Sequence, residues 1–83
     1  MRAFDFDFQG QTFQAVFRQG HIYYDRDKLV AYFGGTPGDA PKKVRAEQAQ
    51  VLLPSPKLKL FQKWHKTAMD ALFELIRIDN EID

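Results

Sequence analysis

Phenylalanines alternate with acids at the start of this chain. Phe4, Phe6 and Phe8 are separated by Asp5 and Asp7. Successive side chains of a β-strand point to opposite faces, so this segment predicts a strand with one apolar face and one wet face. Such a strand needs neighbours in an antiparallel sheet that buries its apolar side.

Two glycine turns supply those neighbours. Gln9-Gly10 and Gln19-Gly20 are ten residues apart, and the dipeptide x-Gly suits a two-residue hairpin turn. Between them, residues 11–18 (QTFQAVFR) alternate again, with Phe13, Ala15 and Phe17 on one face. The sequence therefore predicts a three-stranded antiparallel meander whose short third strand is residues 21–24.

The rest of the chain predicts helices. Asp25 is placed to cap a helix of residues 26–33, which stops at Gly34-Gly35. Pro41 suits the first turn of a short, weakly amphipathic helix to about residue 50, although residues 48–54 also suit an extended segment. Ser55 is a candidate N-cap for a long amphipathic helix. We expect an α+β fold in a single domain, 1–83, in four parts: a meander (1–24), a helix (25–35), a turn and short helix (36–52), and a long helix (56–79) packed on the sheet.

Composition narrows the class of protein. The chain has 83 residues, 45% of them hydrophobic and eight of them Phe, which is enough apolar material for one small core. It has no cysteine, which excludes a disulfide framework and a thiolate metal site and fits a reducing compartment. No apolar run is long enough for a membrane span. We therefore expect a cytoplasmic protein with no membrane partner.

Charge is segregated along the chain although the net charge is only +1. Residues 41–66 contain seven basic residues and one acid, whereas residues 67–83 contain five acids and one base. A basic segment of this kind favours an anionic partner, and its alternative is a solvated surface. The candidate residues for binding DNA or another partner are Lys42, Lys43, Arg45, Lys57, Lys59 and Lys63.

The long helix has more apolar residues than a three-stranded sheet can cover. Its main stripe follows three- and four-residue spacing and faces the sheet. A second subunit or another protein would cover the surplus, and the alternative is that the helix simply wraps a small core. The candidate interface residues for a homodimer or a partner are Leu58, Met69, Phe73 and Ile76.

Catalytic signatures are absent from the sequence. His65 has no acidic residue three or four positions away, which excludes a zinc pair of the HExxH type. Asp25 and Asp27 suit helix capping better than acid–base work, and no glycine-rich phosphate loop occurs. We therefore expect no enzyme activity, no catalytic residue, no metal and no cofactor.

The first half of the chain resembles a known family. The segment FDFQG (residues 6–10), the pair Tyr23-Tyr24, the run Asp27-Lys28-Leu29 and the pair Phe33-Gly34 are similar to the start of the BRO-N domain of phage antirepressors and large DNA virus proteins. This resemblance implies a phage or prophage regulator that binds DNA. The family has further strands where this chain has a proline-rich break and one long helix.

Two other interpretations remain open. Residues 20–35 also look like the wing and following helix of winged helix-turn-helix excisionases, although strands stand where the helix-turn-helix should precede them. Alternatively, the chain is a phage-encoded inhibitor that binds a host protein, such as a repressor or a CRISPR-Cas defence complex. A phage-encoded regulator or inhibitor is expected to act in the cytoplasm of the host cell.

Overall fold

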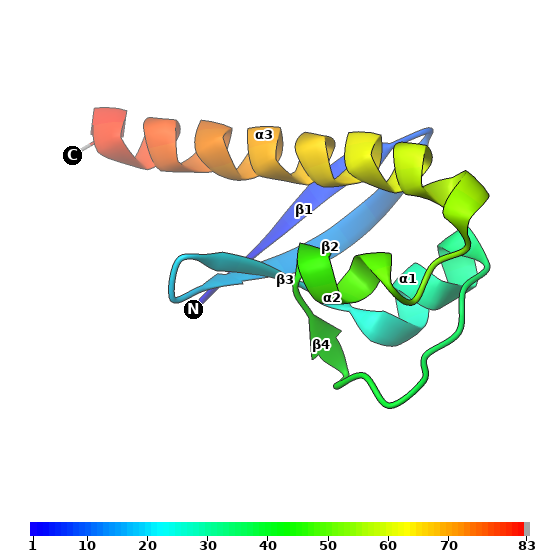
Figure 1. Ribbon diagram of the computed structural model, residues 1–83. Coiled ribbons are helices and arrows are strands. Elements are labelled where there is room, and N and C mark those ends of the chain that lie inside the picture. Colours follow the sequence, from blue (N-terminus) through cyan, green and yellow to red (C-terminus); the bar gives the residue numbers. More distant parts are fainter. Residues whose placement is uncertain (83) are drawn as a thin grey trace.

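The computed structural model describes the backbone of residues 1–82 and the side chains of residues 1–78. Four antiparallel strands form one sheet in the order β1-β2-β3-β4. A long helix, α3, lies across one face of this sheet, and two short helices lie below its N-terminal half (Figure 1). The elements are β1 (Arg2–Phe8), β2 (Gln11–Arg18), β3 (His21–Asp25), α1 (Arg26–Phe33), β4 (Lys43–Val44), α2 (Ala46–Gln50), the 3-10 turn η1 (Ser55–Lys57) and α3 (Leu58–Ile82).

Both glycine turns have the predicted geometry. Gln9 and Gly10 have φ of 51° and 77°, and Gln19 and Gly20 have φ of 52° and 81°. Two successive left-handed residues define a turn whose twist matches that of the flanking strands. The meander therefore closes in a strict register, with Phe6 opposite Phe13 and Ala15 opposite Tyr24.

The sequence predicts three strands, but the sheet of the structure has a fourth, β4. The predicted helix from Pro41 begins only at Ala46, and Lys43–Val44 pair instead with the end of β3, Val44 lying opposite Tyr24. Val44 is fully buried there. Two residues are too few for alternation to reveal a strand, and burial of Val44 in the sheet outweighs a weak helical stripe.

The helix α1 follows its sequence signals. The side chain of Asp25 accepts hydrogen bonds from the backbone N–H groups of Asp27 and Lys28, and Gly34 ends the helix at φ 78°. For α3, the predicted cap at Ser55 is replaced by the turn η1, in which Ser55 is itself helical. Only α3 follows the proline-rich break, and both helices bury apolar residues in the core, Leu29 and Phe33 from α1 and Phe61 and Trp64 from α3.

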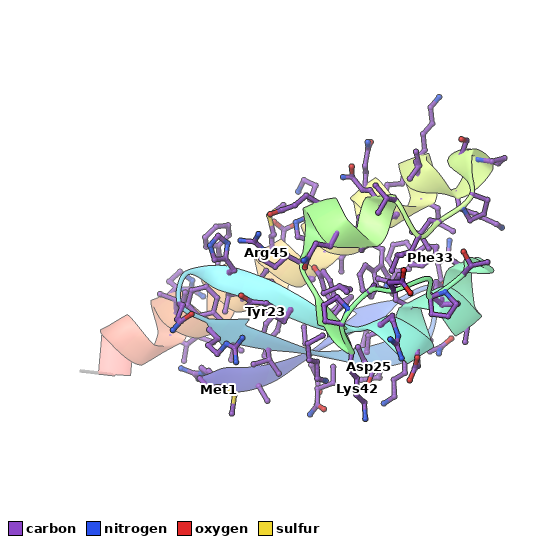
Figure 2. All side chains as sticks on the ribbon, turned by 60° about the horizontal axis from the view of Figure 1, so that its bottom comes forward. Met1, Tyr23, Asp25, Phe33, Lys42 and Arg45 are labelled. Carbon is purple, nitrogen blue, oxygen red and sulfur yellow. The ribbon has the colours of Figure 1, made fainter. Side chains whose placement is uncertain are left out.

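The core is a cluster of aromatic rings around Trp64 of α3. Its ring centroid is within 5.7 Å of five other aromatic rings from the sheet, from α1 and from α3 itself. The remaining buried residues of α3 recur at the predicted spacing and are Phe61, Ala68 and Leu72. The C-terminal turns of α3 run past the edge of the sheet (Figures 1 and 2).

Candidate binding surfaces

The predicted basic segment is divided between two parts of the fold. Its first half lies at β4, where Figure 2 shows Lys42 beside Asp25. The Lys43 ammonium is 3.8 Å from the Asp25 carboxylate, and the Arg45 guanidinium is 3.2 Å from Glu47. These cations therefore face carboxylates of their own chain.

Asp25 is held ionised at this edge. Partial burial alone would raise the pKa of its carboxyl, but the backbone N–H groups of Lys28 and Asp27 and the charges of Lys43 and Lys42 together lower that pKa. The carboxylate thus remains negative beside two of the candidate cations. An external anion at β4 would have to compete with it.

The second half of the basic segment lies at the end of η1 and the start of α3. Lys57, Lys59 and Lys63 are exposed, and no ion pair is found for them among the described residues. No acid occurs from residue 48 to residue 69. Lys66 is the first lysine of the helix to meet one, at 2.9 Å from Asp70. We call Lys57, Lys59 and Lys63 the lysine end of α3.

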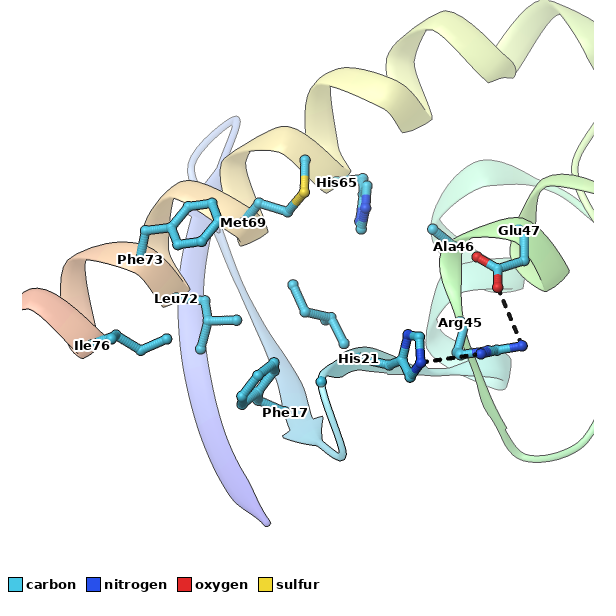
Figure 3. Close-up of a pocket in the computed structure, with 12 residues that line it drawn as sticks. Phe17, His21, Arg45, Ala46, Glu47, His65, Met69, Leu72, Phe73 and Ile76 are labelled. Carbon is cyan, nitrogen blue, oxygen red and sulfur yellow. Dashed lines mark hydrogen bonds and ion pairs between the residues drawn. The ribbon is translucent and has the colours of Figure 1, made fainter.

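An apolar groove lies between the C-terminal half of α3 and the hairpin of β2 and β3 (Figure 3). It has a volume of about 350 Å³. Phe73, which is 64% exposed, and Ile76 stand at its outer rim. The large apolar residues lining the groove are Phe17, Ile22, Met69, Leu72, Phe73 and Ile76.

The inner end of the groove is polar. There Arg45 approaches the His21 ring at 3.5 Å as well as its partner Glu47, and His65 faces them from α3 (Figure 3). The hydroxyl of Tyr24 lies 2.5 Å from Nδ1 of His65. Burial lowers the pKa of His65, although Glu47 opposes this, and burial raises the pKa of Tyr24, so a neutral imidazole accepts from a neutral phenol.

The polar groups at the inner end of the groove are paired within the chain. Nδ1 of His65 is hydrogen-bonded to the Tyr24 hydroxyl, and the one carboxylate of the lining, on Glu47, is paired with Arg45. Among residues with described side chains, no group of three or more metal-ligating side chains gathers in one place. The groove therefore presents an apolar surface with two charged groups, Arg45 and Glu47, at one end.

A smaller hollow lies on the opposite, uncovered face of the sheet. Tyr23 and Arg18 line it, and the Arg18 guanidinium lies over the Tyr23 ring, 4.8 Å from the centroid. Met1, Val16 and Lys43 also line the hollow, which has a volume of about 100 Å³. Arg18 already occupies the ring face on which a base would stack.

Three of the four predicted interface residues come together. Met69, Phe73 and Ile76 line the groove, whereas Leu58 packs against the core at the other end of α3. Sequence reasoning missed the other wall, which consists of Phe17 and Ile22. Both occupy inward positions of their strands, and nothing local distinguishes a strand residue at the end of the core from one at its centre.

No family model, curated protein or solved structure matches the chain. No helix among the described residues has the length and hydropathy needed to cross a membrane. The function of the protein must therefore be argued from its own surfaces.

Proposed function

We propose that this protein is a small non-catalytic regulator that binds duplex DNA, and that the lysine end of α3 makes the contact. One observation is central: Lys57, Lys59 and Lys63 form the part of the basic segment that meets no carboxylate among the residues whose side chains the structure describes. Free cations of this kind release counterions from DNA when they meet phosphates. The BRO-N resemblance of the first half favours the same class of function.

The arrangement of α3 supports phosphate contacts rather than base recognition. Lysine is a flexible point charge, and the exposed residues near these lysines include few amides that read base edges. We therefore expect binding with little sequence preference. With three phosphates neutralised, affinity should fall about 40-fold between about 50 and 200 mM salt.

The test compares two triple variants with equal changes of charge. Lys57→Glu, Lys59→Glu and Lys63→Glu together should abolish retention on heparin and the shift of a short duplex at low salt. Lys28→Glu, Lys42→Glu and Lys43→Glu together should keep most of the binding, because two of these lysines already face Asp25. Circular dichroism checks that both variants are folded.

Two outcomes would overturn the proposal. One is a wild-type chain that does not shift DNA at low salt. The other is an equal loss of binding in both triple variants, because total charge alone would then explain the attraction. Lys28, Lys42 and Lys43 would replace the lysine end of α3 as the DNA contact if only their own variant lost binding.

A further inference from the structure

We infer that the groove is a self-association site, in which α3 of a second copy of this chain packs antiparallel against α3 and closes the groove. The proposal is independent of DNA binding. A second copy of the chain would cover an apolar surface that the monomer leaves exposed.

Three residues of α3 form an apolar stripe that its own sheet does not cover. Met69, Phe73 and Ile76 follow one another at spacings of four and three residues, so they lie on one side of the helix. At 3.6 residues per turn, this stripe is rotated by roughly a third of a turn from the buried stripe that includes Phe61 and Ala68. Phe73 and Ile76 are 64% and 36% exposed, and Ile78 is 39% exposed.

The C-terminal turns of α3 extend past the part of the helix that packs on the sheet. Most helical stability in proteins comes from packing an apolar side, and an uncovered stretch of helix is marginal in water. The last turns of α3 run beyond the sheet (Figure 1). Phe73, Ile76 and Ile78, in the C-terminal half of the helix, are exposed apolar side chains. A second apolar helix laid along the groove would supply the missing packing.

The distribution of charge along α3 favours a second copy of this chain as the partner, and it favours an antiparallel arrangement of the two helices. From residue 57 to residue 66 the chain has four lysines and no acid, whereas from residue 67 to residue 83 it has five acids and one base. Two antiparallel copies of α3 that cross next to Phe73 therefore bring Lys66 level with the acidic last turns of the partner helix and leave Lys57 and Lys59 outside the contact, while parallel copies would place like charges together. The partner with matching charge is this chain itself.

The pairing also satisfies the geometry of a two-fold dimer. If the helices cross next to Phe73, then Met69 of one copy lies beside Ile76 of the other, and the same contact repeats on the other side of the axis. Phe73 of each copy then enters the groove of its partner, whose far wall is Phe17 and Ile22. Each subunit gives and receives the same side chains, as an isologous interface requires.

The first experiment measures mass against concentration by sedimentation equilibrium. The wild type should approach twice the chain mass of 9.7 kDa as concentration rises. Phe73→Asp should raise the dissociation constant at least about 30-fold, because a charge would enter an apolar pocket. Val51→Asp is the matched control, since Val51 is apolar and 82% exposed but lies outside the groove, and it should leave the dissociation constant unchanged.

The second experiment tests orientation with single cysteines, which are informative because the chain has none of its own. When Met69→Cys and Ile76→Cys chains are mixed and oxidised, the mixed disulfide should predominate. Predominance of the two like-with-like disulfides would indicate parallel helices and overturn the antiparallel pairing.

The inference fails if the wild type is a monomer at every concentration, which would leave the groove to a different protein. It also fails if Phe73→Asp, shown to be folded by circular dichroism, dimerises like the wild type. Loss of DNA binding in the lysine variants would not affect either measurement, so the two proposals can fail separately.

Discussion

Gly35 illustrates how much of the packing depends on single residues. A Cβ at this position would lie 2.2 Å from the carbonyl oxygen of Leu52 and 3.0 Å from the Leu53 side chain. The same two segments are joined by a hydrogen bond from Thr36 N–H to that oxygen, at 2.9 Å. Gly34, one residue earlier, has open space around it and is needed only for its left-handed φ of 78°.

The two glycines should therefore differ when replaced. Gly35→Ala should cost about 3 kcal/mol of unfolding free energy, because backbone must move to admit the methyl group. Gly34→Ala should cost about 1 kcal/mol, the usual penalty for a left-handed residue with a side chain. Urea denaturation of both variants gives the comparison, and an equal or larger loss in Gly34→Ala would contradict the close contact.

At the scale of elements, α3 is attached to β3 by a polar contact as well as by the core. Tyr24 of β3 donates to His65 of α3, whose ring stacks on Phe61 with an interplanar angle of 6°. Because the pKa of His65 is lowered below its ordinary 6.5, the folded state favours the neutral ring. Protonation of His65 therefore favours the unfolded chain.

This contact predicts a pH dependence of stability. The contribution is complete above the unfolded-state pKa of 6.5 and is lost as pH falls through the lower, folded-state value. The wild type should lose stability between about pH 7.5 and pH 5, whereas His65→Gln should lose less over the same interval. Thermal melts at both pH values test this, and identical losses in the two proteins would remove His65 from the explanation.

For the whole molecule, the two proposals combine into a specific architecture. Lys59 and Lys63 lie roughly a quarter of a turn around α3 from the apolar stripe, away from the buried side. A two-fold axis perpendicular to the helix pair then leaves both lysine ends on one face of the dimer, opposite the two sheets. Their separation is roughly 40 Å along the helices, from the 1.5 Å rise per residue.

Such a dimer should bind DNA through two points at once. If so, Phe73→Asp should weaken binding to a duplex that spans both lysine ends by at least about tenfold, because the second contact is lost. Val51→Asp, with the same change of charge, should bind like the wild type. Titration by fluorescence anisotropy measures both. Equal affinity of the two variants would mean that each subunit binds DNA alone.

The sequence by itself was sufficient for the meander, for α1 and for the buried stripe of α3. These features depend on local chemistry: Gln9-Gly10 and Gln19-Gly20 can adopt left-handed turns, Asp25 can cap a helix, and apolar spacing is visible along one chain. It was also sufficient to select Met69, Phe73 and Ile76 as surplus apolar residues.

Only the tertiary structure decided where these residues meet others. Val44 became a strand residue because it pairs with Tyr24, a residue twenty positions away. The second wall of the groove, Phe17 and Ile22, and the division of the basic segment into paired and free cations have the same origin. Such contacts depend on distance through space between segments remote in sequence, which no local pattern records.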